Sequence, residues 1–236
     1  MARKASRRVW LWALLAPFGC AFLAQPAPRV LPSACGAVGK SAPRVARAAE
    51  AEAAPAESKQ AALDILAQSA LTKETDPEEV FDAIRVLEKA KNRTGESGFA
   101  HFLTGDWRLV YTTGTKKTET DVGRINYVPI TAVQRFDMDK KFIRNGVYLG
   151  PVSLEFEGTL RWIEERRRME FDFEELKICG FSPSLPDWLR SMAGMRSSSP
   201  YKKQPAFDFV AVDERIAAAR GAGGGVALWL RNELAD

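Results

Sequence analysis

Histidine and cysteine are scarce in this 236-residue sequence, and that scarcity argues against several classes of protein. A Ser-His-Asp or Cys-His mechanism would have to use His101, the single histidine, and no nucleophile lies in a G-x-S-x-G motif. Cys20 and Cys35 lie near the N-terminus, which leaves Cys179 alone in the rest of the chain. One histidine and one cysteine disfavour a zinc site and allow no internal disulfide. We therefore expect no catalytic residue, metal or cofactor.

Signatures of phosphate binding and of general acid–base catalysis are also missing. The glycine-rich stretch Gly221–Gly225 lacks the Lys-Ser/Thr pair of a phosphate loop and precedes a strand-like segment, so we interpret it as a hairpin turn. Glu174 and Glu175 are adjacent in a strand-like segment and are expected on its opposite faces, where they cannot act as a pair. These absences disfavour a hydrolase.

Acidic residues are absent from residues 1–47, which nevertheless hold eight of the 34 lysines and arginines. All 30 acidic residues lie in the remainder, so the overall charge of +4 belongs to the N-terminal segment and the remainder is net acidic. A net acidic domain lacks the basic footprint of a nucleic-acid-binding protein. We predict no nucleic-acid partner.

The N-terminal segment begins like a secretory signal. Residues 1–8 are basic, and residues 9–23 form an apolar run that is short for a membrane span and is interrupted by Pro17. The small residues Gly19-Cys20-Ala21 suit a signal peptidase. This pattern predicts a signal peptide over residues 1–21.

A second targeting segment is predicted directly after the first. Residues 22–47 are rich in Ala, Pro, Ser and Arg, which is the composition of a plastid transit peptide. A signal peptide followed by a transit part that opens with Phe22 resembles the bipartite leaders of algae with secondary plastids. The leader therefore predicts a plastid location, and the alternative is a signal peptide followed by a disordered secreted linker.

Two helices are predicted ahead of the strands, after a linker over residues 48–57. The first helix, over residues 58–71, has small and apolar residues at helical spacing: Leu63, Leu66, Ala67 and Ala70. The second begins at Asp76, which can cap it, and at Pro77, which suits the first turn; Gly95 can end it. Its expected buried stripe is Val80, Ile84 and Leu87.

Nearly everything after residue 103 has strand character. In the stretch 103–113, Trp107, Leu109 and Tyr111 alternate with polar residues, which predicts a strand with these three side chains on one buried face. Further segments with strand character are 133–137, 142–149, 152–163, 169–178, 207–212, a weaker stretch after Asp213, and 226–231. About eight consecutive antiparallel strands favour a small barrel over the alternative, a sandwich.

One insertion interrupts the strands. Residues 180–206 are rich in Ser and Pro but include a short amphipathic helix pattern, whose apolar face is Leu185, Trp188, Leu189 and Met192. Apolar residues flanked by cations are typical of a membrane contact or of a lid on the barrel. A loop that folds its apolar side back on the barrel is equally compatible with the pattern.

Three groups of residues follow one another along the chain: Leu87-Glu88 with Leu103, Gly105, Trp107, Leu109 and Tyr111-Thr112-Thr113; Val133-Gln134 with Phe136-Asp137, Asn145 and Val147; and Val212-Asp213-Glu214 with Arg220-Gly221 and Leu228. In this order, over residues 58–232, the sequence resembles the plastid-lipid-associated proteins, or plastid fibrillins. One departure is Ala217-Ala218-Ala219, where the family usually has an arginine. The Trp188 loop has no clear counterpart in the family either.

The resemblance implies a lipocalin-like barrel that binds or sequesters prenylquinones, carotenoids or similar lipids at thylakoid or plastoglobule surfaces. Aromatic residues could line its apolar cavity: Trp107, Tyr111, Phe156, Phe171, Phe173 and Trp229. Packing in a filled core is the competing interpretation of the same residues. Asp213 and Arg220 are expected to form an ion pair near the barrel rim, because a buried charge requires a partner.

Three hypotheses for the function follow from the sequence. The first is a non-enzymatic lipid-binding protein at a plastid membrane surface. The second is a structural or assembly module on a thylakoid protein complex, with a barrel filled by its own side chains. The third, ranked last, is an enzyme that modifies a lipid inside the barrel.

Overall fold

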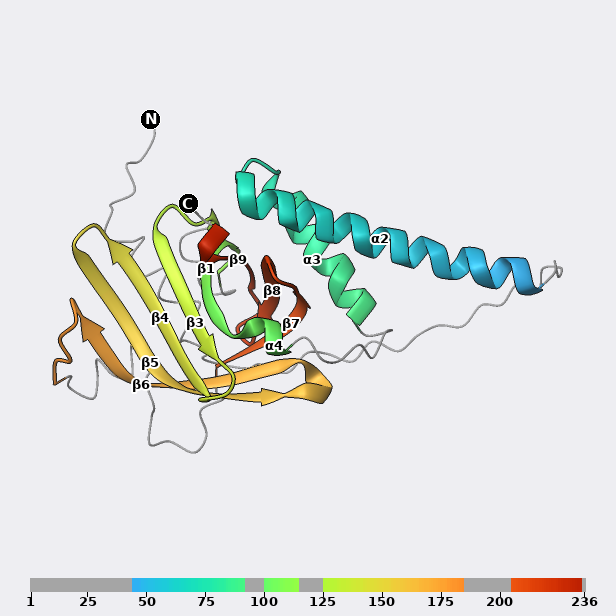
Figure 1. Cartoon of the computed structure of the whole chain (residues 1–236). Coiled ribbons are helices and arrows are strands. Elements are labelled where there is room, and N and C mark those ends of the chain that lie inside the picture. Colours follow the sequence, from blue (N-terminus) through green and yellow to red (C-terminus); the bar gives the residue numbers. More distant parts are fainter. Residues whose placement is uncertain (1–43, 92–99, 115–124, 185–204, 235–236) are drawn as a thin grey trace, which may run out of the picture.

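A ring of antiparallel strands with two long helices on one side makes up the fold (Figure 1). The computed structural model describes residues 44–91, 100–114, 125–184 and 205–234, with side chains from residue 57 onward. Its helices are α2 (Arg44–Thr72), α3 (Pro77–Lys91) and α4 (Ala100–Leu103), and short 3-10 turns span Glu164–Arg166 and Asn232–Leu234. Its strands are β1 (Gly105–Thr112), β2 (Asn126–Tyr127), β3 (Thr131–Asp137), β4 (Phe142–Leu149), β5 (Val152–Ile163), β6 (Arg168–Ile178), β7 (Ala206–Val212), β8 (Ile216–Gly221) and β9 (Val226–Arg231).

Eight of the strands close into a barrel. The order is β1-β3-β4-β5-β6-β7-β8-β9, and each strand is antiparallel to its neighbours. Because β9 also pairs with β1, the ring has no free end. The short β2 pairs with the end of β1. The antiparallel barrel predicted from the strand count is confirmed, since a sandwich would need two separate sheets, and it is consistent with the lipocalin-like barrel that the resemblance implies.

The predicted strand bounds agree closely with the observed ones. β4, β5 and β9 coincide with the predicted segments, and the weaker stretch after Asp213 is β8. The two-residue β2 was not expected from the sequence. The agreement is good because turn residues separate each pair of alternating segments, as Asp139-Lys140 does between β3 and β4.

A side-chain cap explains where α3 begins, and a high content of helix-forming residues explains the early start of α2. The backbone N–H of Glu78 donates to Oδ1 of Asp76 at 2.8 Å, which confirms the predicted cap of α3. The predicted C-terminal Gly95 lies outside the described residues. Helix α2 starts at Arg44, so the segment 48–57, predicted as a linker, is helical; its alanines and glutamates are strong helix formers.

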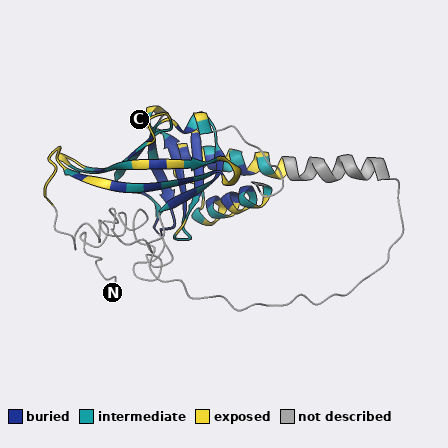
Figure 2. Ribbon diagram, turned by 90° about the horizontal axis from the view of Figure 1, so that it is seen from below, coloured by how far each residue is buried: buried dark blue, intermediate teal, exposed yellow. Residues whose placement is uncertain are grey.

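Both helices pack on the outer face of one half of the barrel. Ala62, Leu66 and Ala70 of α2 lie four residues apart and are buried. The buried positions of α3 are Val80, Ala83, Ile84 and Leu87, which confirms the predicted stripe. They meet outward residues of four strands, and we call the whole the helix-facing cluster: the seven helical residues with Val110, Tyr111, Val210, Ala211, Ile216, Ala218, Val226, Leu228 and Leu230. In Figure 2 the strands beside these helices are mostly buried.

Two β-bulges turn side chains from the barrel interior towards the helices. In β1 the register against β9 shifts between Leu109 and Tyr111, and in β7 the register against β8 shifts between Phe209 and Ala211. Leu109 and Phe209 belong to the interior, whereas the two residues after each of them face the helices. A bulge adds one residue to a strand and thereby reverses the alternation beyond it.

A third bulge lies between β5 and β6. Gly158 fits there because a Cβ at this position would overlap the carbonyl oxygen of Asp172 on the facing strand. The extra residue on β6 leaves both Glu174 and Glu175 exposed. The sequence-based expectation that these two acids lie on opposite faces is therefore wrong, because the bulge interrupts the period of two.

Within the described part of the chain, no helix is both long enough and apolar enough to cross a lipid bilayer.

Candidate functional site

The interior of the barrel is the candidate site, and aromatic side chains dominate it. Five of the six predicted wall residues lie there, each at most 6% exposed: Trp107, Phe156, Phe171, Phe173 and Trp229. Phe136, Phe207 and Phe209 also lie in the interior, although they were not among the six predicted wall residues. All of them occupy alternating positions of their strands, which is why most could be identified from the sequence.

These rings form a continuous series of contacts across the interior. Phe156 contacts Phe173, and Phe173 contacts Phe171, with ring centroids 5.7 and 5.4 Å apart. Phe207 contacts both Phe171 and Trp229, with ring centroids 5.0 and 5.2 Å apart. Aromatic pairs at such distances contribute about 0.5–1.5 kcal/mol each beyond the burial of their area. The series links β5 and β6 with β7 and β9.

Small side chains, and not aromatic rings, line the interior at β8 and at the adjoining part of β9. Ala217 and Ala219 face the interior from β8, and Ala227 does so from β9. The alanines 217–219 stand where related sequences were expected to carry an arginine, and Ala218 faces the helices instead. This part of the wall is therefore built of small, uncharged side chains.

Two amide side chains interrupt the apolar interior. Gln134 of β3 and Asn145 of β4 are directly paired across the two strands and are 1% and 4% exposed. Trp107 on β1 lies opposite Gln134, and Phe156 on β5 lies opposite Asn145. One row of four neighbouring strands thus presents an aromatic ring, two amides and a second aromatic ring to the interior.

Neither amide has a hydrogen-bond partner in the structure. The oxygen and nitrogen atoms of both side chains, and Nε1 of Trp229, are buried and unpaired. Leaving a buried donor or acceptor unpaired costs about 1–3 kcal/mol, so such groups are rare without a compensating partner. The sequence signal for this pair is a polar residue at an inward position between apolar ones, as Gln134 is between Ala132 and Phe136.

One side of Trp107 is covered. Its Nε1–H donates to the carbonyl oxygen of Leu103 in α4 at 2.8 Å. The guanidinium of Arg231 lies 4.1 Å from the Trp107 ring centroid and donates to the carbonyl oxygens of Phe102 and Thr104, both at 2.9 Å. This cation–π contact and α4 together hold the tryptophan in place at the base of β1.

A pocket of about 280 Å³ lies on the paired strands β5 and β6, lined by residues 159–161 and 170–172. Its lining includes the interior residues Leu160 and Phe171. The two amides lie outside it. Within the described residues, no group of three or more His, Cys, Asp or Glu side chains is placed to hold a metal ion.

The sequence of the helical layer and the barrel matches a family model. The model for PAP_fibrillin matches residues 59–228, most of the chain. The chain belongs to the PAP_fibrillin family. No curated protein matches the sequence significantly.

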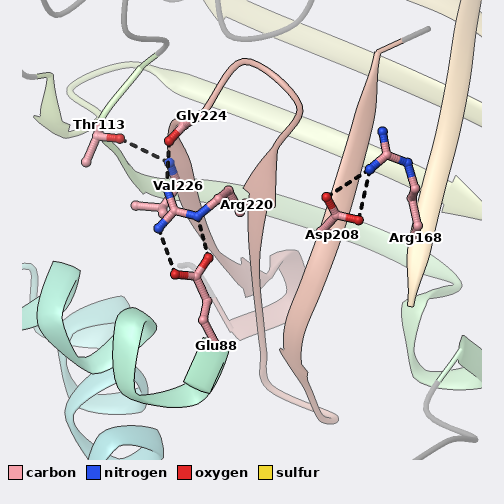
Figure 3. A network of polar contacts seen from close by, with 7 residues as sticks. All are labelled: Glu88, Thr113, Arg168, Asp208, Arg220, Gly224 and Val226. Atoms are coloured by element: carbon pink, nitrogen blue, oxygen red, sulfur yellow. Dashed lines mark hydrogen bonds and ion pairs between the residues drawn. The ribbon is translucent and has the colours of Figure 1, made fainter. Parts of the chain in front are cut away.

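Two of the fibrillin motif segments meet in an ion pair between a helix and the barrel (Figure 3). Nη2 of Arg220, at the end of β8, donates to Oε2 of Glu88 in α3 at 2.8 Å, and its Nε donates to Oε1. Nη1 of Arg220 also donates to the carbonyl oxygen of Gly224 at 2.6 Å. The hydrogen bonds from Arg220 to Glu88 raise the pKa of the guanidinium. We call this arrangement the Glu88–Arg220 clasp.

The expected ion pair between Asp213 and Arg220 is wrong. Oδ1 of Asp213 instead accepts hydrogen bonds from the backbone N–H groups of Arg215 and Ile216, both at 2.7 Å. Asp213 therefore caps the β7–β8 turn, while Arg220 lies at the other end of β8. The acid that pairs with Arg220 is 132 residues away in the sequence, where spacing gives no signal.

The remaining fibrillin motif residues shape turns. Gly105 has φ +138°, and a Cβ there would overlap the Arg231 guanidinium. Asp137 accepts a hydrogen bond from the Lys140 backbone N–H at 2.9 Å in the β3–β4 turn, and this bond lowers the pKa of Asp137. The backbone N–H of Gly221 donates to the carbonyl oxygen of Gly225 at 2.8 Å, consistent with the predicted hairpin turn.

Tyr111, predicted as part of the cavity wall, is not in the interior. The bulge in β1 turns it into the helix-facing cluster, where its hydroxyl donates to the carbonyl oxygen of Pro77 at 3.0 Å. Its ring contacts that of Tyr127, whose hydroxyl donates to the carbonyl oxygen of Thr75 at 2.6 Å. Both tyrosines therefore hold the start of α3 against the barrel.

The predicted membrane-contact or lid residues, Leu185, Trp188, Leu189 and Met192, lie outside the described residues. The chain just before them forms an exposed tip with the β4–β5 turn. Residues 149–152 and 178–184 contain no charged residue, and they expose Leu149, Val152, Ile178 and Phe181. The backbone N–H of Cys179 donates to the carbonyl oxygen of Ser153 at 2.9 Å, which joins the two turns. We call these two segments the apolar tip.

Proposed function

We propose that this fibrillin-family protein is a non-enzymatic lipid-binding protein of plastids, which holds an apolar lipid inside its barrel at a thylakoid or plastoglobule surface. The lipid classes in question are prenylquinones, carotenoids and similar molecules. The bipartite leader expected over residues 1–47 supports delivery to the plastid.

The observation that carries this proposal is the composition of the barrel interior. Rings from six strands, β1, β3, β5, β6, β7 and β9, meet in one apolar cluster, and the β8 wall is made of alanine. Ligand sites for apolar molecules are lined in this way, with a few polar groups that fix orientation. Eight-stranded barrels are wide enough to hold one small ligand.

The apolar tip supports contact with a lipid surface. Phe181 is 78% exposed, the tip also exposes the aliphatic Leu149, Val152 and Ile178, and its two segments carry no charged residue. In Figure 2 this end of the long strands is exposed and lies on the side of the molecule opposite α2. A cluster of exposed apolar side chains without charge suits insertion between lipid head groups.

The direct test is to identify what the interior retains. The full chain is purified, incubated with a plastid lipid extract, isolated again and extracted with organic solvent for mass spectrometry. We expect one lipid class at a stoichiometry near one per chain. A folded protein that releases no lipid would contradict the proposal.

Matched variants locate the retained lipid. Trp229→Leu removes an interior ring, and at subsaturating lipid we expect about fivefold less retention from the loss of roughly 1 kcal/mol of ring contacts. Arg135→Ala changes an outward, exposed side chain of β3 that does not line the pocket, and should retain as much lipid as the wild type. Equal retention by both variants would exclude the interior as the site.

The ring contacts also favour a second function, a structural or assembly module on a thylakoid protein complex. A series of directly touching rings can fill a barrel without a ligand. The extraction experiment separates the two functions, because a module with a filled barrel stays folded and carries no lipid.

A further inference from the structure

The interior contains a polar site that the apolar cluster does not explain. Gln134 and Asn145 are paired on adjacent strands, and all four of their side-chain polar atoms are buried without a partner. Side chains directly opposite each other on antiparallel strands have Cβ atoms about 4.5–5.5 Å apart. The two amides can therefore reach one atom placed between them.

The inward residues of this row carry no charge that could compensate an anion at the amide pair. Aromatic rings flank it on both sides, Trp107 next to Gln134 and Phe156 next to Asn145. Among the described residues, the one buried cation is Arg167, which lies in the turn between β5 and β6. An anionic head group at the amide pair would therefore be buried without a counter-charge, which is strongly unfavourable.

A purely hydrocarbon ligand does not satisfy the pair either, because it would leave all four polar atoms without hydrogen bonds. An uncharged oxygen does satisfy it. A carbonyl oxygen has two lone pairs and can accept one hydrogen bond from each amide nitrogen, and a hydroxyl can also donate to an amide oxygen.

We propose that Gln134 and Asn145 together bind the carbonyl or hydroxyl oxygen of an uncharged amphipathic lipid, whose hydrocarbon part lies among the interior aromatic rings. This inference rests on the proposed function and specifies its ligand class. Quinones, ketones and alcohols with long hydrocarbon tails fit the pair, and phospholipids and fatty-acid anions do not. The unpaired Nε1–H of Trp229 is a further donor in the same interior.

The test compares three probes with ten-carbon alkyl or acyl chains: decyl-1,4-benzoquinone, decylbenzene and decanoate. Binding of each to the full chain is measured by isothermal titration calorimetry. We expect the quinone to bind about 10- to 100-fold more tightly than decylbenzene, as two added hydrogen bonds would give. Decanoate should bind no more tightly than decylbenzene. Tighter binding of decanoate than of the quinone would overturn the proposal.

Variants assign the preference to the two residues. In the double variant Gln134→Leu/Asn145→Leu, the quinone should lose its 10- to 100-fold advantage while the affinity for decylbenzene stays the same or rises. Phe136→Leu, an interior change on the same strand, should weaken both probes equally. The carbonyl stretching band of the bound quinone should shift to lower frequency in the wild type and not in the double variant.

Thermal unfolding without ligand gives an independent readout. Because the leucines remove buried groups that have no partner, the double variant should unfold at a higher temperature than the wild type. A lower unfolding temperature would mean that the amides serve the fold and would overturn their assignment as a ligand site.

The outcomes distinguish this inference from the proposed function. If the wild type binds neither the quinone nor decylbenzene, both the proposed function and the inference fail. If it binds both with similar affinity, and the double variant does the same, a lipid-binding interior remains and the amide site is refuted.

Discussion

The two halves of the barrel wall differ in what covers their outer face. Strands β7, β8, β9 and β1 are covered by α2 and α3, and we call them the covered half; their outward residues belong to the helix-facing cluster. Strands β3, β4, β5 and β6, the open half, have charged outer faces, with ion pairs such as Arg161–Glu170 and Lys177–Glu157. The open half ends in the apolar tip.

The two halves are expected to contribute differently to the stability of the fold and to the contact with a lipid surface. The covered half is buried on both faces, so its strands contribute most of the packing between helices and barrel. The open half is buried only on the inner face and leaves its outer face and its tip to solvent or to a lipid surface. We therefore expect mutations in the covered half to change the free energy of unfolding, and mutations at the tip to change membrane contact.

The largest expected effect is at the helix-facing cluster. Leu66→Ala removes a fully buried side chain of α2 and should lower the free energy of unfolding by about 2–5 kcal/mol, because it leaves a cavity. Leu71→Ala, on the same helix but 56% exposed, should change it by less than about 0.5 kcal/mol. Urea unfolding measures both; similar small effects would show that α2 does not stabilise the barrel.

The next effect compares one ion pair from each half. A double-mutant cycle on the Glu88–Arg220 clasp should give a coupling of about 1.5–3 kcal/mol, since its hydrogen bonds are charged, multiple and partly buried. The same cycle on Arg161–Glu170 should give about 0–1 kcal/mol, because Arg161 is exposed and water screens the pair. Equal couplings would remove the energetic distinction between the halves.

A smaller effect is expected at Tyr111. Tyr111→Phe removes the hydrogen bond to the Pro77 carbonyl and should cost about 0.5–1.5 kcal/mol, with lipid retention unchanged. Unfolding and retention are measured on the same preparation. A loss of retained lipid in a variant of near-normal stability would contradict this and indicate that Tyr111 contacts the lipid.

The smallest effect on stability is expected at the apolar tip. Val152→Ser and Phe181→Ser should each change the free energy of unfolding by less than about 0.5 kcal/mol, because both side chains are exposed. Together they should lower the fraction of protein that floats with galactolipid vesicles. Leu71→Ser, an exposed change on the helical side, is the control and should float like the wild type. If the tip double variant floats as much as the Leu71→Ser control, the tip does not contact lipid.

Most of the open half was predictable from the sequence, because its strands alternate regularly up to the bulge after Phe173. Leu154 and Phe156, or Phe171 and Phe173, are two residues apart, and each pair lies in the interior as expected. The covered half was less predictable. The bulge after Leu109 moves Tyr111 to the other face, and nothing local in the sequence marks the inserted residue.

The candidate site was predictable in part. The aromatic lining follows from the strand pattern, and the family resemblance singled out Gln134 and Asn145 without a role. Their position side by side depends on the register between β3 and β4, which a single sequence does not specify. The partner of Arg220 was missed for a similar reason, since Glu88 reaches it through the packing of α3 on the barrel.

The most direct measurement of the central claim is a crystal structure of the protein after incubation with plastid lipids. We predict continuous density for one elongated molecule between the aromatic rings, with an oxygen within hydrogen-bonding distance of Gln134 and Asn145. Density inside the barrel that the protein's own side chains account for completely would contradict the claim and favour a structural module.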